Sequence, residues 1–531
     1  MTLALGRWLR DRARATPHRT AIVFEGDDTS YGELDARSER LAAGLLAAGV
    51  RPGDRVATLT GNRPEHVELF FACAKAGLVL TPVNVRLTAP EVAYQLTDAE
   101  PSILLAAPEL VPLAEEARMR SGHPCRIAEL TRDGLDALAS TASEATAPHT
   151  PGEHNGTGDD GGPGTGHSVP NDPNDPNDPA DDAGLLLVYT GGTTGRPKGA
   201  LLTHANCFWT NLSLDRGCEL REDDVVLQVL PQFHVGGWNV QPLLAWWKGA
   251  TVVLEPSFDA GRTLRLIAER GVTTMMGVPA TYLFMAQDPG FATADLSRLR
   301  RVVVGGAPMP EPLLRTWLDR GVRIVQGYGL TEAAPNVLCL PEEDIEGRVG
   351  WAGIPYPHVD VALRDVETGG TLDGAGIGEL VVRGPNVFPG YWRDPEATRA
   401  AVTGGWLRTG DIAERDADGF YRIRGRAKDM YVSGGENVYP AEAESVLQGH
   451  AEVAEVAVVG VPDERWGEVG CAFVVPVPGA APEASDLIAY CRVLLAGFKV
   501  PKYVRLVDRL PRSAVDKVLK SKLRGVWEQA G

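Results

Sequence analysis

The first 140 residues of the chain alternate between helical and strand-like patterns of hydrophobic positions. An amphipathic segment over 31–48 precedes the strand-like 55–60, and a helix-like run over 64–76 leads into the apolar segment 79–83. Alternation of this kind is typical of parallel strands with covering helices. We therefore predict an α/β fold for this part of the chain.

The same alternation continues after residue 250. The pattern predicts strands over 252–254, 273–276, 302–304 and 322–326, with helices over 260–270 and 311–319. Right-handed crossovers make such strands parallel, so their carboxyl ends line one edge of the sheet, where open α/β sheets bind ligands. Three glycine-bearing segments are expected to meet at that edge: Gly277, Gly305–Ala307 and Gly327–Glu332.

The residues beyond about 428 carry a separate alternation of strand and helix patterns, such as the apolar run 453–459 followed by a polar turn. A chain of 531 residues is also too long for one ordinary domain. We therefore expect a second, smaller domain at this end of the chain.

Half of the net charge of −18 arises from one segment. Residues 141–183 contain nine acidic residues, no lysine or arginine, and three successive Asn-Asp-Pro repeats. Such a stretch buries too little apolar surface to offset the entropy of ordering it. We predict a flexible acidic insertion that acts as a solvated spacer, with a docking motif as the alternative. Since the rest of the chain is only mildly acidic, we expect no nucleic-acid partner.

Composition also bears on the compartment. The seven cysteines include no Cys-x-x-Cys pair, which argues for a reducing environment and against a zinc site or a disulfide framework. The N-terminus lacks the apolar run of a secretory signal, and no stretch approaches the roughly 20 apolar residues of a membrane span. We expect a soluble, cytoplasmic protein.

Residues 189–199 carry the most specific chemistry in the sequence. Their glycines let the backbone approach a ligand closely, Thr193 and Thr194 offer hydroxyls, and Arg196 and Lys198 supply positive charge. These are the groups that bind a polyphosphate, although an ordinary glycine turn is the alternative. The segment follows a buried strand over 185–188 and is not the common P-loop.

This string resembles the phosphate-binding signature of the AMP-forming acyl-CoA synthetases, which belong to the wider family of adenylate-forming enzymes. Relatives usually carry serine where Gly191 stands. The resemblance implies an α/β protein with a large N-terminal domain of mixed and parallel sheets, residues 1–427, and a small mobile α+β C-terminal domain, residues 428–531. Lys428 matches the hinge between the two domains.

The resemblance also assigns the nucleotide site. The glycine-alanine turn lines the adenine, Tyr328 stacks on it, and Thr331 and Glu332 address phosphate and magnesium. Asp411, in a Thr-Gly-Asp motif, and Arg426 contact the ribose. The residues implied for ATP and AMP are Thr190, Gly191, Gly192, Thr193, Thr194, Lys198, Gly305, Gly306, Ala307, Gly327, Tyr328, Gly329, Thr331, Asp411 and Arg426. Thr190 and Glu332 are the implied Mg²⁺ ligands, since hard cations favour oxygen.

Two further sites follow from the same resemblance. The loop at Ser433, Gly434 and Gly435 meets the thiol of coenzyme A, and Trp466 contacts its nucleotide, with a solvent-shielding tryptophan as the alternative. Lys517 matches the lysine that completes the adenylation site. The preceding Asp516 replaces the usual glycine, and at a left-handed position its Cβ would be a strain.

The acyl pocket is assigned to the segment 233–239. The resemblance implies pocket residues His234, Gly236, Trp238 and Asn239, with His234 near the reacting carboxylate. Further aromatic residues suggest an apolar pocket, although core packing is their commoner use: Trp246, Trp247, Tyr282 and Phe284. No aspartate that would pair with the ammonium of an amino acid occurs between residues 231 and 241. We expect a hydrophobic acid: aliphatic, aromatic or a bulky natural-product carboxylate.

The implied reaction has two steps, with Lys517, His234, Glu332 and Thr190 as the catalytic residues. ATP and Mg²⁺ activate a carboxylic acid to acyl-AMP with release of pyrophosphate, and coenzyme A then takes the acyl group. Two alternatives stay open: transfer to a carrier protein, and a silenced relative that binds adenylate or coenzyme A without adenylating. A homodimer is also left open.

Overall fold

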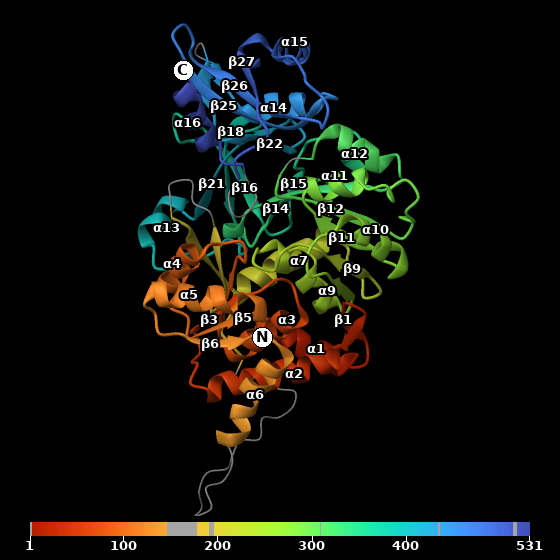
Figure 1. The fold of residues 1–531 in the computed structure, drawn as a ribbon, viewed down its shortest axis with the longest axis vertical. Helices are drawn as coiled ribbons and strands as arrows, with labels where there is room; N and C mark the ends of the chain where they lie inside the picture. Colours follow the sequence, from red (N-terminus) through yellow and green to blue (C-terminus); the bar gives the residue numbers. More distant parts are fainter. Residues whose placement is uncertain are drawn as a thin grey trace, which may run out of the picture.

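The computed structural model describes residues 3–145, 178–190, 196–307, 309–433, 436–512 and 518–530. The N-terminal part contains two large, mainly parallel sheets with helices around them, and the C-terminal part forms a smaller unit at the opposite end from α1 and α2 (Figure 1). The expected α/β class, with a large N-terminal domain and a small C-terminal one, is confirmed.

The first sheet, as the described residues form it, has the order β15-β14-β13-β12-β11-β9-β10-β1-β2. Its strands are β1 (Thr20–Phe24), β2 (Asp27–Ser30), β9 (Val225–Gln228), β10 (Thr251–Leu254), β11 (Thr274–Gly277), β12 (Arg301–Val304), β13 (Ile324–Gly329), β14 (Asn336–Cys339) and β15 (Ile354–Pro355). Strands β11, β12 and β13 are parallel neighbours, as predicted. Their carboxyl ends therefore bring the three glycine-bearing segments to one edge.

One boundary differs from the prediction. Gly327, Tyr328 and Gly329 continue strand β13 instead of forming a loop after it, because they pair antiparallel with Cys339, Leu338 and Asn336 of β14.

The second sheet has the order β19-β8-β7-β4-β3-β5-β6. Its strands are β3 (Arg55–Leu59), β4 (Val79–Val83), β5 (Ile103–Ala106), β6 (Arg126–Glu129), β7 (Gly184–Thr190), β8 (Lys198–Thr203) and β19 (Gly390–Tyr391). Strands β3, β4 and β5 are parallel, as the alternation predicted. Strands β7 and β8 form an antiparallel hairpin, so the predicted phosphate segment 189–199 begins in β7 and ends in β8.

Helices cover both sheets. Most of their apolar faces form one large core with the strands, while α4 and α5 pack on β3, β4 and β5 in a separate, smaller cluster. The helices of the N-terminal part are α1 (Gly6–Ala15), α2 (Tyr31–Ala47), α3 (Pro64–Ala76), α4 (Ala89–Ala99), α5 (Val111–Ser121), α6 (Arg132–Ala145), α7 (His204–Cys218), α8 (Gly236–Asn239), α9 (Pro242–Lys248), α10 (Ala260–Glu269), α11 (Pro279–Gln287), α12 (Glu311–Leu318) and α13 (Pro395–Ala401). Helices α2 and α3 begin and end within one residue of the predicted segments.

A third, antiparallel sheet leads to the C-terminal unit. It consists of β16 (Asp360–Arg364), β17 (Thr371–Leu372), β18 (Gly376–Arg383), β20 (Val402–Thr403), β21 (Trp406–Arg415) and β22 (Tyr421–Arg426). A turn over 427–429 follows β22, and the next strand belongs to the C-terminal sheet. Lys428 therefore lies in the connection between the two parts, and its role as a hinge stays a prediction.

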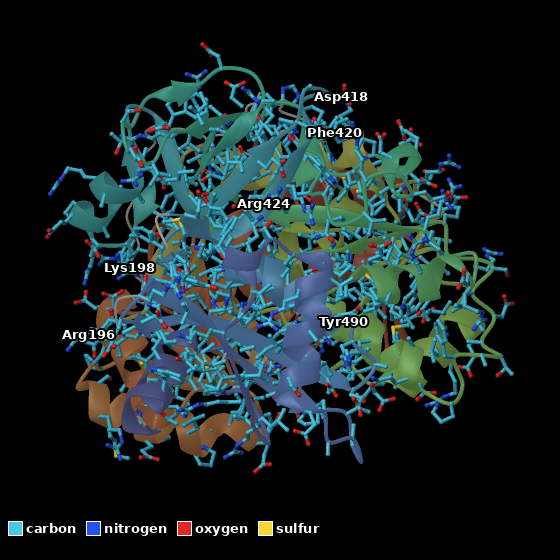
Figure 2. All side chains as sticks on the ribbon, turned by 90° about the horizontal axis from the view of Figure 1, so that it is seen from above. Arg196, Lys198, Asp418, Phe420, Arg424 and Tyr490 are labelled. Carbon is cyan, nitrogen blue, oxygen red and sulfur yellow. The ribbon has the colours of Figure 1, made fainter. Side chains whose placement is uncertain are left out.

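The C-terminal unit contains strands β23 (Tyr431–Ser433), β24 (Glu436–Val438), β25 (Val453–Asp463), β26 (Gly467–Pro476) and β27 (Tyr503–Leu506), with helices α14 (Pro440–Gln448), α15 (Ala484–Leu494) and α16 (Lys520–Ala530). The long β25–β26 hairpin has an apolar cluster on each face. Arg424 of β22 pairs with Glu414 of β21 at 2.5 Å and with Glu442 of α14 at 2.6 Å, so it ties the two parts together beside the connection. Figure 2 labels Arg424 near the centre of the view from above.

Both ends of the predicted acidic insertion, 141–183, include residues that belong to the described fold. Helix α6 extends to Ala145, and on the far side Asp178 accepts hydrogen bonds from Arg10 while Asp181 accepts one from the Leu3 N–H at 2.6 Å. Carboxylates that bind a guanidinium and a backbone amide explain why this end of the acidic segment is part of the fold. Residues 146–177 lie outside the described part of the chain. In the described part, no helix is long and apolar enough to cross a membrane.

Candidate active site

The carboxyl ends of β11, β12 and β13 form a surface on which side chains would obstruct neighbouring groups. A Cβ on Gly305 would lie 2.9 Å from the Met276 Cε, and one on Gly329 would lie 1.9 Å from the Pro335 carbonyl oxygen. Gly306 has φ +79°, which favours glycine. Ala307 follows it and is exposed. The predicted adenine turn is thus built as an open surface beside Tyr328.

Tyr328 contacts the predicted ribose residues directly. Its hydroxyl donates a hydrogen bond to Asp411 Oδ2 at 2.5 Å, and Arg426 Nε lies 2.6 Å from the other carboxylate oxygen, Oδ1. Asp411 and Arg426 face each other across β21 and β22, which explains how residues 15 positions apart meet. Burial, reinforced by the charge of Asp411, raises the pKa of Tyr328, so its hydroxyl stays a donor.

The surroundings of Asp411 hold its carboxylate in a fixed orientation. The residue is only 5% exposed, and its backbone N–H donates to Thr409 Oγ1 at 3.0 Å. A carboxylate held in this way accepts hydrogen bonds well from a pair of hydroxyls. The structure therefore brings Tyr328, Asp411 and Arg426 into one group, as the resemblance implied.

A second group forms around the Glu332 carboxylate. Thr190 Oγ1 lies 3.5 Å from Glu332 Oε1, and the Tyr391 hydroxyl donates to the same oxygen at 2.8 Å. Lys198 Nζ lies 5.3 Å above the Tyr391 ring, which is a cation–π distance. The predicted magnesium residues Thr190 and Glu332 are thus neighbours, although Thr190 ends β7 and Glu332 lies in a short 3-10 turn after β13.

Backbone hydrogen bonds hold both Glu332 and its partner Tyr391 in place. The backbone carbonyl of Glu332 accepts from the Phe388 N–H at 2.9 Å, and β19, which contains Tyr391, pairs with β8. Burial and the charge of Glu332 raise the pKa of Tyr391, so this hydroxyl also stays a donor.

Sequence reasoning missed Tyr391. It belongs to the aromatic run Tyr391-Trp392 that follows a Pro-Gly turn, and that turn was the available signal.

The chemistry of these groups fits a hard cation. One carboxylate and one hydroxyl are oxygen ligands, and Mg²⁺ commonly combines one or two protein oxygens with water and substrate phosphates. No cluster of three or more His, Cys, Asp or Glu able to hold a metal occurs among the described residues. Glu332 and Thr190 would therefore hold Mg²⁺ together with phosphate oxygens.

The phosphate hairpin is described at both ends. Thr190 and Lys198 form the last pair of the β7–β8 ladder, and the Thr190 hydroxyl donates to the Lys198 carbonyl at 3.4 Å. Arg196 and Lys198 lie near each other in Figure 2. The predicted phosphate residues of the loop itself lie outside the described residues: Gly191, Gly192, Thr193 and Thr194.

The segment that carries His234 is held in place by hydrogen bonds of the Asn62 side chain. Asn62 donates from Nδ2 to the Leu230 carbonyl at 2.9 Å and to the Glu255 carbonyl at 3.1 Å, and its Oδ1 accepts from the Gln232 N–H at 2.8 Å. His234 itself is half-buried, with its ring 4.7 Å from that of Phe233. Gly236, which begins α8, is likewise half-buried.

Several aromatic residues assigned to the acyl pocket belong to the core. Trp238 has 0% exposure, stacks on Phe70 at 4.7 Å and donates to the Gln232 carbonyl. Trp246 donates to the Ala21 carbonyl. Trp247 stacks on Trp8, Tyr282 packs on Trp317, and Phe284 is exposed.

Asn239 is also fully buried, between Asn211 and Cys207. These side chains support the segment from within, and their place in an acyl pocket stays a prediction.

The predicted coenzyme A residues that are described lie together. Ser433 of β23 pairs with Gly467 of β26, immediately after Trp466. Trp466 is 45% exposed, and the Arg465 guanidinium lies 4.7 Å above its ring. Contact of Trp466 with the nucleotide of coenzyme A stays a prediction. Gly434, Gly435, Asp516 and Lys517 lie outside the described residues.

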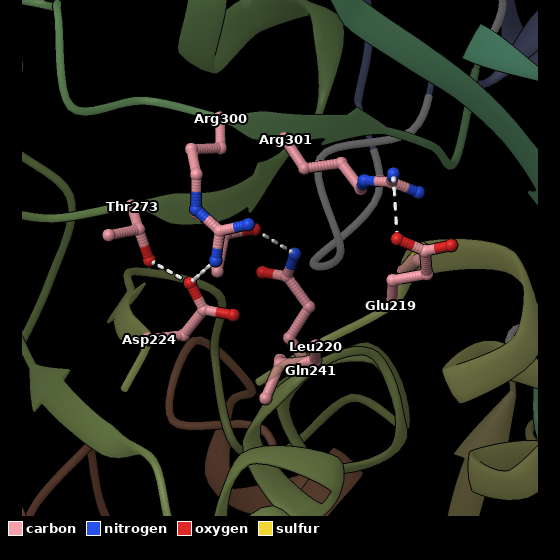
Figure 3. A pocket seen from close by; sticks show the side chains of 9 residues that line it. Glu219, Leu220, Asp224, Gln241, Thr273, Arg300 and Arg301 are labelled. Atoms are coloured by element: carbon pink, nitrogen blue, oxygen red, sulfur yellow. Dashed lines mark hydrogen bonds and ion pairs between the residues drawn. The ribbon is translucent and has the colours of Figure 1, made fainter. Parts of the chain in front are cut away.

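A pocket elsewhere on the first sheet contains none of the predicted site residues (Figure 3). Asp224 pairs there with Arg300 and accepts from Thr273 Oγ1 at 2.5 Å, while Arg301 lies 3.8 Å from Glu219. Its charged groups satisfy one another, which is typical of a structural site.

Known proteins match both parts of the chain. Residues 9–392 match the family described as AMP-binding enzyme, and residues 442–517 match the AMP-binding enzyme C-terminal domain. Feruloyl-CoA synthase from an Amycolatopsis species is 42% identical over 520 residues, 98% of each chain. Indoleacetate–CoA ligase from Aromatoleum aromaticum is 39% identical over 529 residues, again 98% of each chain.

Solved structures agree in fold. ATP-bound MatB from Rhodopseudomonas palustris is 34% identical and has a TM-score of 0.85, with 99% of each chain covered. One assignment follows from the sequence matches, the shared fold and the two groups around Asp411 and Glu332. The chain belongs to the AMP-binding enzyme family and is an AMP-forming acid–CoA ligase.

Proposed function

We propose that this protein activates an aryl-substituted or similarly hydrophobic carboxylic acid at the site between Asp411 and Glu332. ATP, Mg²⁺ and coenzyme A are its substrates and cofactor, as for its family. The observation that carries the residue roles is the pairing of Thr190 and Tyr391 with one oxygen of Glu332, beside the Tyr328–Asp411–Arg426 group. One group supplies oxygen ligands for a phosphate-bound cation, and the other supplies acceptors and donors for a ribose.

In the first step, an oxygen of the acid carboxylate attacks the α-phosphorus of ATP. The bond to the bridging oxygen of the β-phosphate breaks, and pyrophosphate leaves with that electron pair. The protein contributes by placing the reactants and by stabilising charge on phosphate oxygens. Asp411 and Arg426 orient the ribose, Thr190 and Lys198 bind the departing phosphates, and Glu332 holds Mg²⁺. Lys517 bridges the carboxylate and the α-phosphate.

In the second step, the thiolate of coenzyme A attacks the acyl carbon of acyl-AMP and AMP leaves. One site that serves two transition states requires a rearrangement between them. We propose that the C-terminal domain turns about Lys428, which withdraws Lys517 and presents the loop of Ser433, Gly434 and Gly435. The location of Lys428 in the turn between the third sheet and β23 supports this role.

The class of acid follows from the relatives and the sequence. The two relatives described above are named for feruloyl and indoleacetate groups, both of which are aromatic. No aspartate occurs between residues 231 and 241 to pair with an amino acid, and the supporting shell of Trp238 and Phe70 is apolar. We therefore propose an aryl acid as the preferred substrate.

The seven cysteines are free and buried, as in proteins of a reducing compartment, and we propose a cytoplasmic location on that ground.

Pyrophosphate exchange into ATP tests the proposal across a panel of cinnamic, arylacetic, fatty and amino acids. We expect exchange with the aryl acids at the lowest concentrations, and acyl-CoA once coenzyme A is added. Absence of exchange with every acid would indicate a silenced relative. Exchange without acyl-CoA formation would indicate a carrier protein as the acceptor.

A further inference from the structure

Helix α4 lies against the phosphate hairpin without contributing a residue to the proposed site. Tyr94 and Asp98 are four residues apart on this helix, so their side chains lie on one face. Both are half-buried. Each makes a hydrogen bond to a different arm of the hairpin.

The first arm is held through Asp98. The Tyr189 hydroxyl donates to Asp98 Oδ2 at 2.6 Å, and Tyr189 directly precedes Thr190, the last residue of β7. Burial, followed by the hydrogen bond to Asp98, raises the pKa of Tyr189. Its hydroxyl is therefore a permanent donor to this carboxylate.

The second arm is held through Tyr94. The Tyr94 hydroxyl donates to the Pro197 carbonyl at 3.0 Å, and Pro197 directly precedes Lys198, the first residue of β8. The Arg196 guanidinium lies 5.6 Å from the centroid of the Tyr94 ring. The aromatic ring thus also contacts the cationic side chain at the end of the loop.

A third contact extends the arrangement to the metal residues. Trp392 donates from Nε1 to the Asp98 carbonyl at 3.2 Å, and its backbone N–H donates to the Gly199 carbonyl at 2.7 Å. Trp392 follows Tyr391, which binds Glu332. One turn of α4 therefore contacts both arms of the phosphate hairpin and the strand that orients Glu332.

We infer that Tyr94 and Asp98 are positioning residues that set the spacing and direction of the two arms of the phosphate loop, and so determine affinity for the β- and γ-phosphates of ATP. This inference rests on the proposed function of the hairpin. AMP lacks those two phosphates, so its affinity should depend far less on the arms. A purely structural role of α4 would affect ATP and AMP equally.

The test compares affinities for MgATP and AMP by calorimetry in the full-length protein. The variants are Tyr94→Phe and Tyr189→Phe, which each remove one hydroxyl, and the pair Asp98→Ala and Asp98→Asn. The amide of Asp98→Asn still accepts from the Tyr189 hydroxyl, so this variant should be the milder of the two. Tyr31→Phe is the matched control, because the Tyr31 hydroxyl also donates to a backbone carbonyl, that of Ala250 at 2.6 Å, away from the hairpin.

We expect the MgATP dissociation constant to rise about tenfold in Tyr94→Phe and Tyr189→Phe, the size of one hydrogen bond, while that for AMP stays within about twofold. Thioester formation from supplied acyl-AMP should be unchanged. Equal weakening of ATP and AMP, no weakening of either, or the same change in Tyr31→Phe would overturn the inference. If the wild-type protein binds MgATP but the variants match it, only this inference fails; if the wild type neither binds MgATP nor exchanges pyrophosphate, the proposed function fails as well.

Discussion

Tyr391 and Glu332 lie 59 residues apart in the sequence and are joined by a hydrogen bond of 2.8 Å from the phenol to Oε1. The same oxygen faces Thr190 at 3.5 Å, so the phenol directs the carboxylate toward the phosphate hairpin. Tyr391 is therefore expected to orient the proposed Mg²⁺ ligand without being a ligand itself.

Replacing Tyr391 with Phe tests this role. Loss of a hydrogen bond to a charged group costs about 1.5–3 kcal/mol, so we expect adenylation to fall by roughly ten- to a hundredfold. In the same variant, the Mg²⁺ concentration that gives half-maximal pyrophosphate exchange should rise. Glu332→Gln should have the larger effect. An unchanged Mg²⁺ titration in Tyr391→Phe would place the metal elsewhere.

The Asp411 carboxylate is expected to bind the ribose hydroxyls. Asp411→Asn keeps the shape and removes the charge that faces Arg426 and Tyr328. We expect ATP affinity to fall about a hundredfold, since charge-assisted hydrogen bonds are about twice as strong as neutral ones. The comparison with 2′,3′-dideoxy-ATP is decisive. The wild type should bind 2′,3′-dideoxy-ATP more weakly than ATP. Asp411→Asn should bind the two nucleotides with nearly the same affinity. Equal losses in both proteins would remove Asp411 from the ribose site.

Asn62 is expected to affect the acid and not the nucleotide. It fastens the segment before His234 through Leu230 and Gln232. In Asn62→Asp the acceptor for the Gln232 N–H remains, but a carboxylate replaces the donor to the Leu230 and Glu255 carbonyls. We expect the KM for the acid to rise at least about tenfold, with the KM for ATP unchanged. A parallel rise of both constants would point to general loss of stability instead.

Stability should fall below about pH 6.5 because of His204. Its Nδ1 accepts from the Leu5 N–H, and burial lowers the pKa from 6.5 to about 4. Between these values the unfolded chain binds a proton that the folded protein does not, so acid favours unfolding. The full effect at pH 4 is about 3 kcal/mol. Above pH 6.5 both states are neutral and the contribution to pH dependence vanishes.

Chemical unfolding between pH 4 and 8 measures this effect. His204→Asn retains an acceptor for the Leu5 N–H but does not titrate. Its free energy of unfolding should therefore depend less on pH, because unfolding takes up as much as one proton fewer than in the wild type. Burial lowers the pKa of His66 to about 3, so this histidine is a second group of the same kind and is present in both proteins. Parallel pH profiles for wild type and His204→Asn would contradict the prediction.

The sequence was sufficient for the strand-end part of the site and insufficient for the rest. Gly277, Gly305 and Gly327 could be placed at one edge because crossover handedness and strand alternation determine where parallel strands end. Tyr391 could not be found in this way, since its contact with Glu332 joins β19 of the second sheet to the turn that follows β13 of the first. The sequence could not decide whether Trp238 supports the core or lines the acyl pocket, because burial in a core and burial around a ligand select the same residue types. The positions of Lys517 and the hinge came from resemblance alone.

Lys517 offers the sharpest separation of the two proposed steps. Its ammonium is expected to stabilise charge on the carboxylate and α-phosphate only during adenylation, so Lys517→Ala should reduce acyl-AMP formation by at least about a hundredfold. Thioester formation from supplied acyl-AMP and coenzyme A should stay near the wild-type rate. Lys520→Ala is the control, because Lys520 pairs with Glu444 at 2.7 Å within the C-terminal domain. Asp516→Gly restores the residue usual in relatives and removes a negative charge beside Lys517, so adenylation should quicken. Equal loss of both steps in Lys517→Ala would refute the two-conformation assignment, because a lysine that serves both steps does not need to be withdrawn between them.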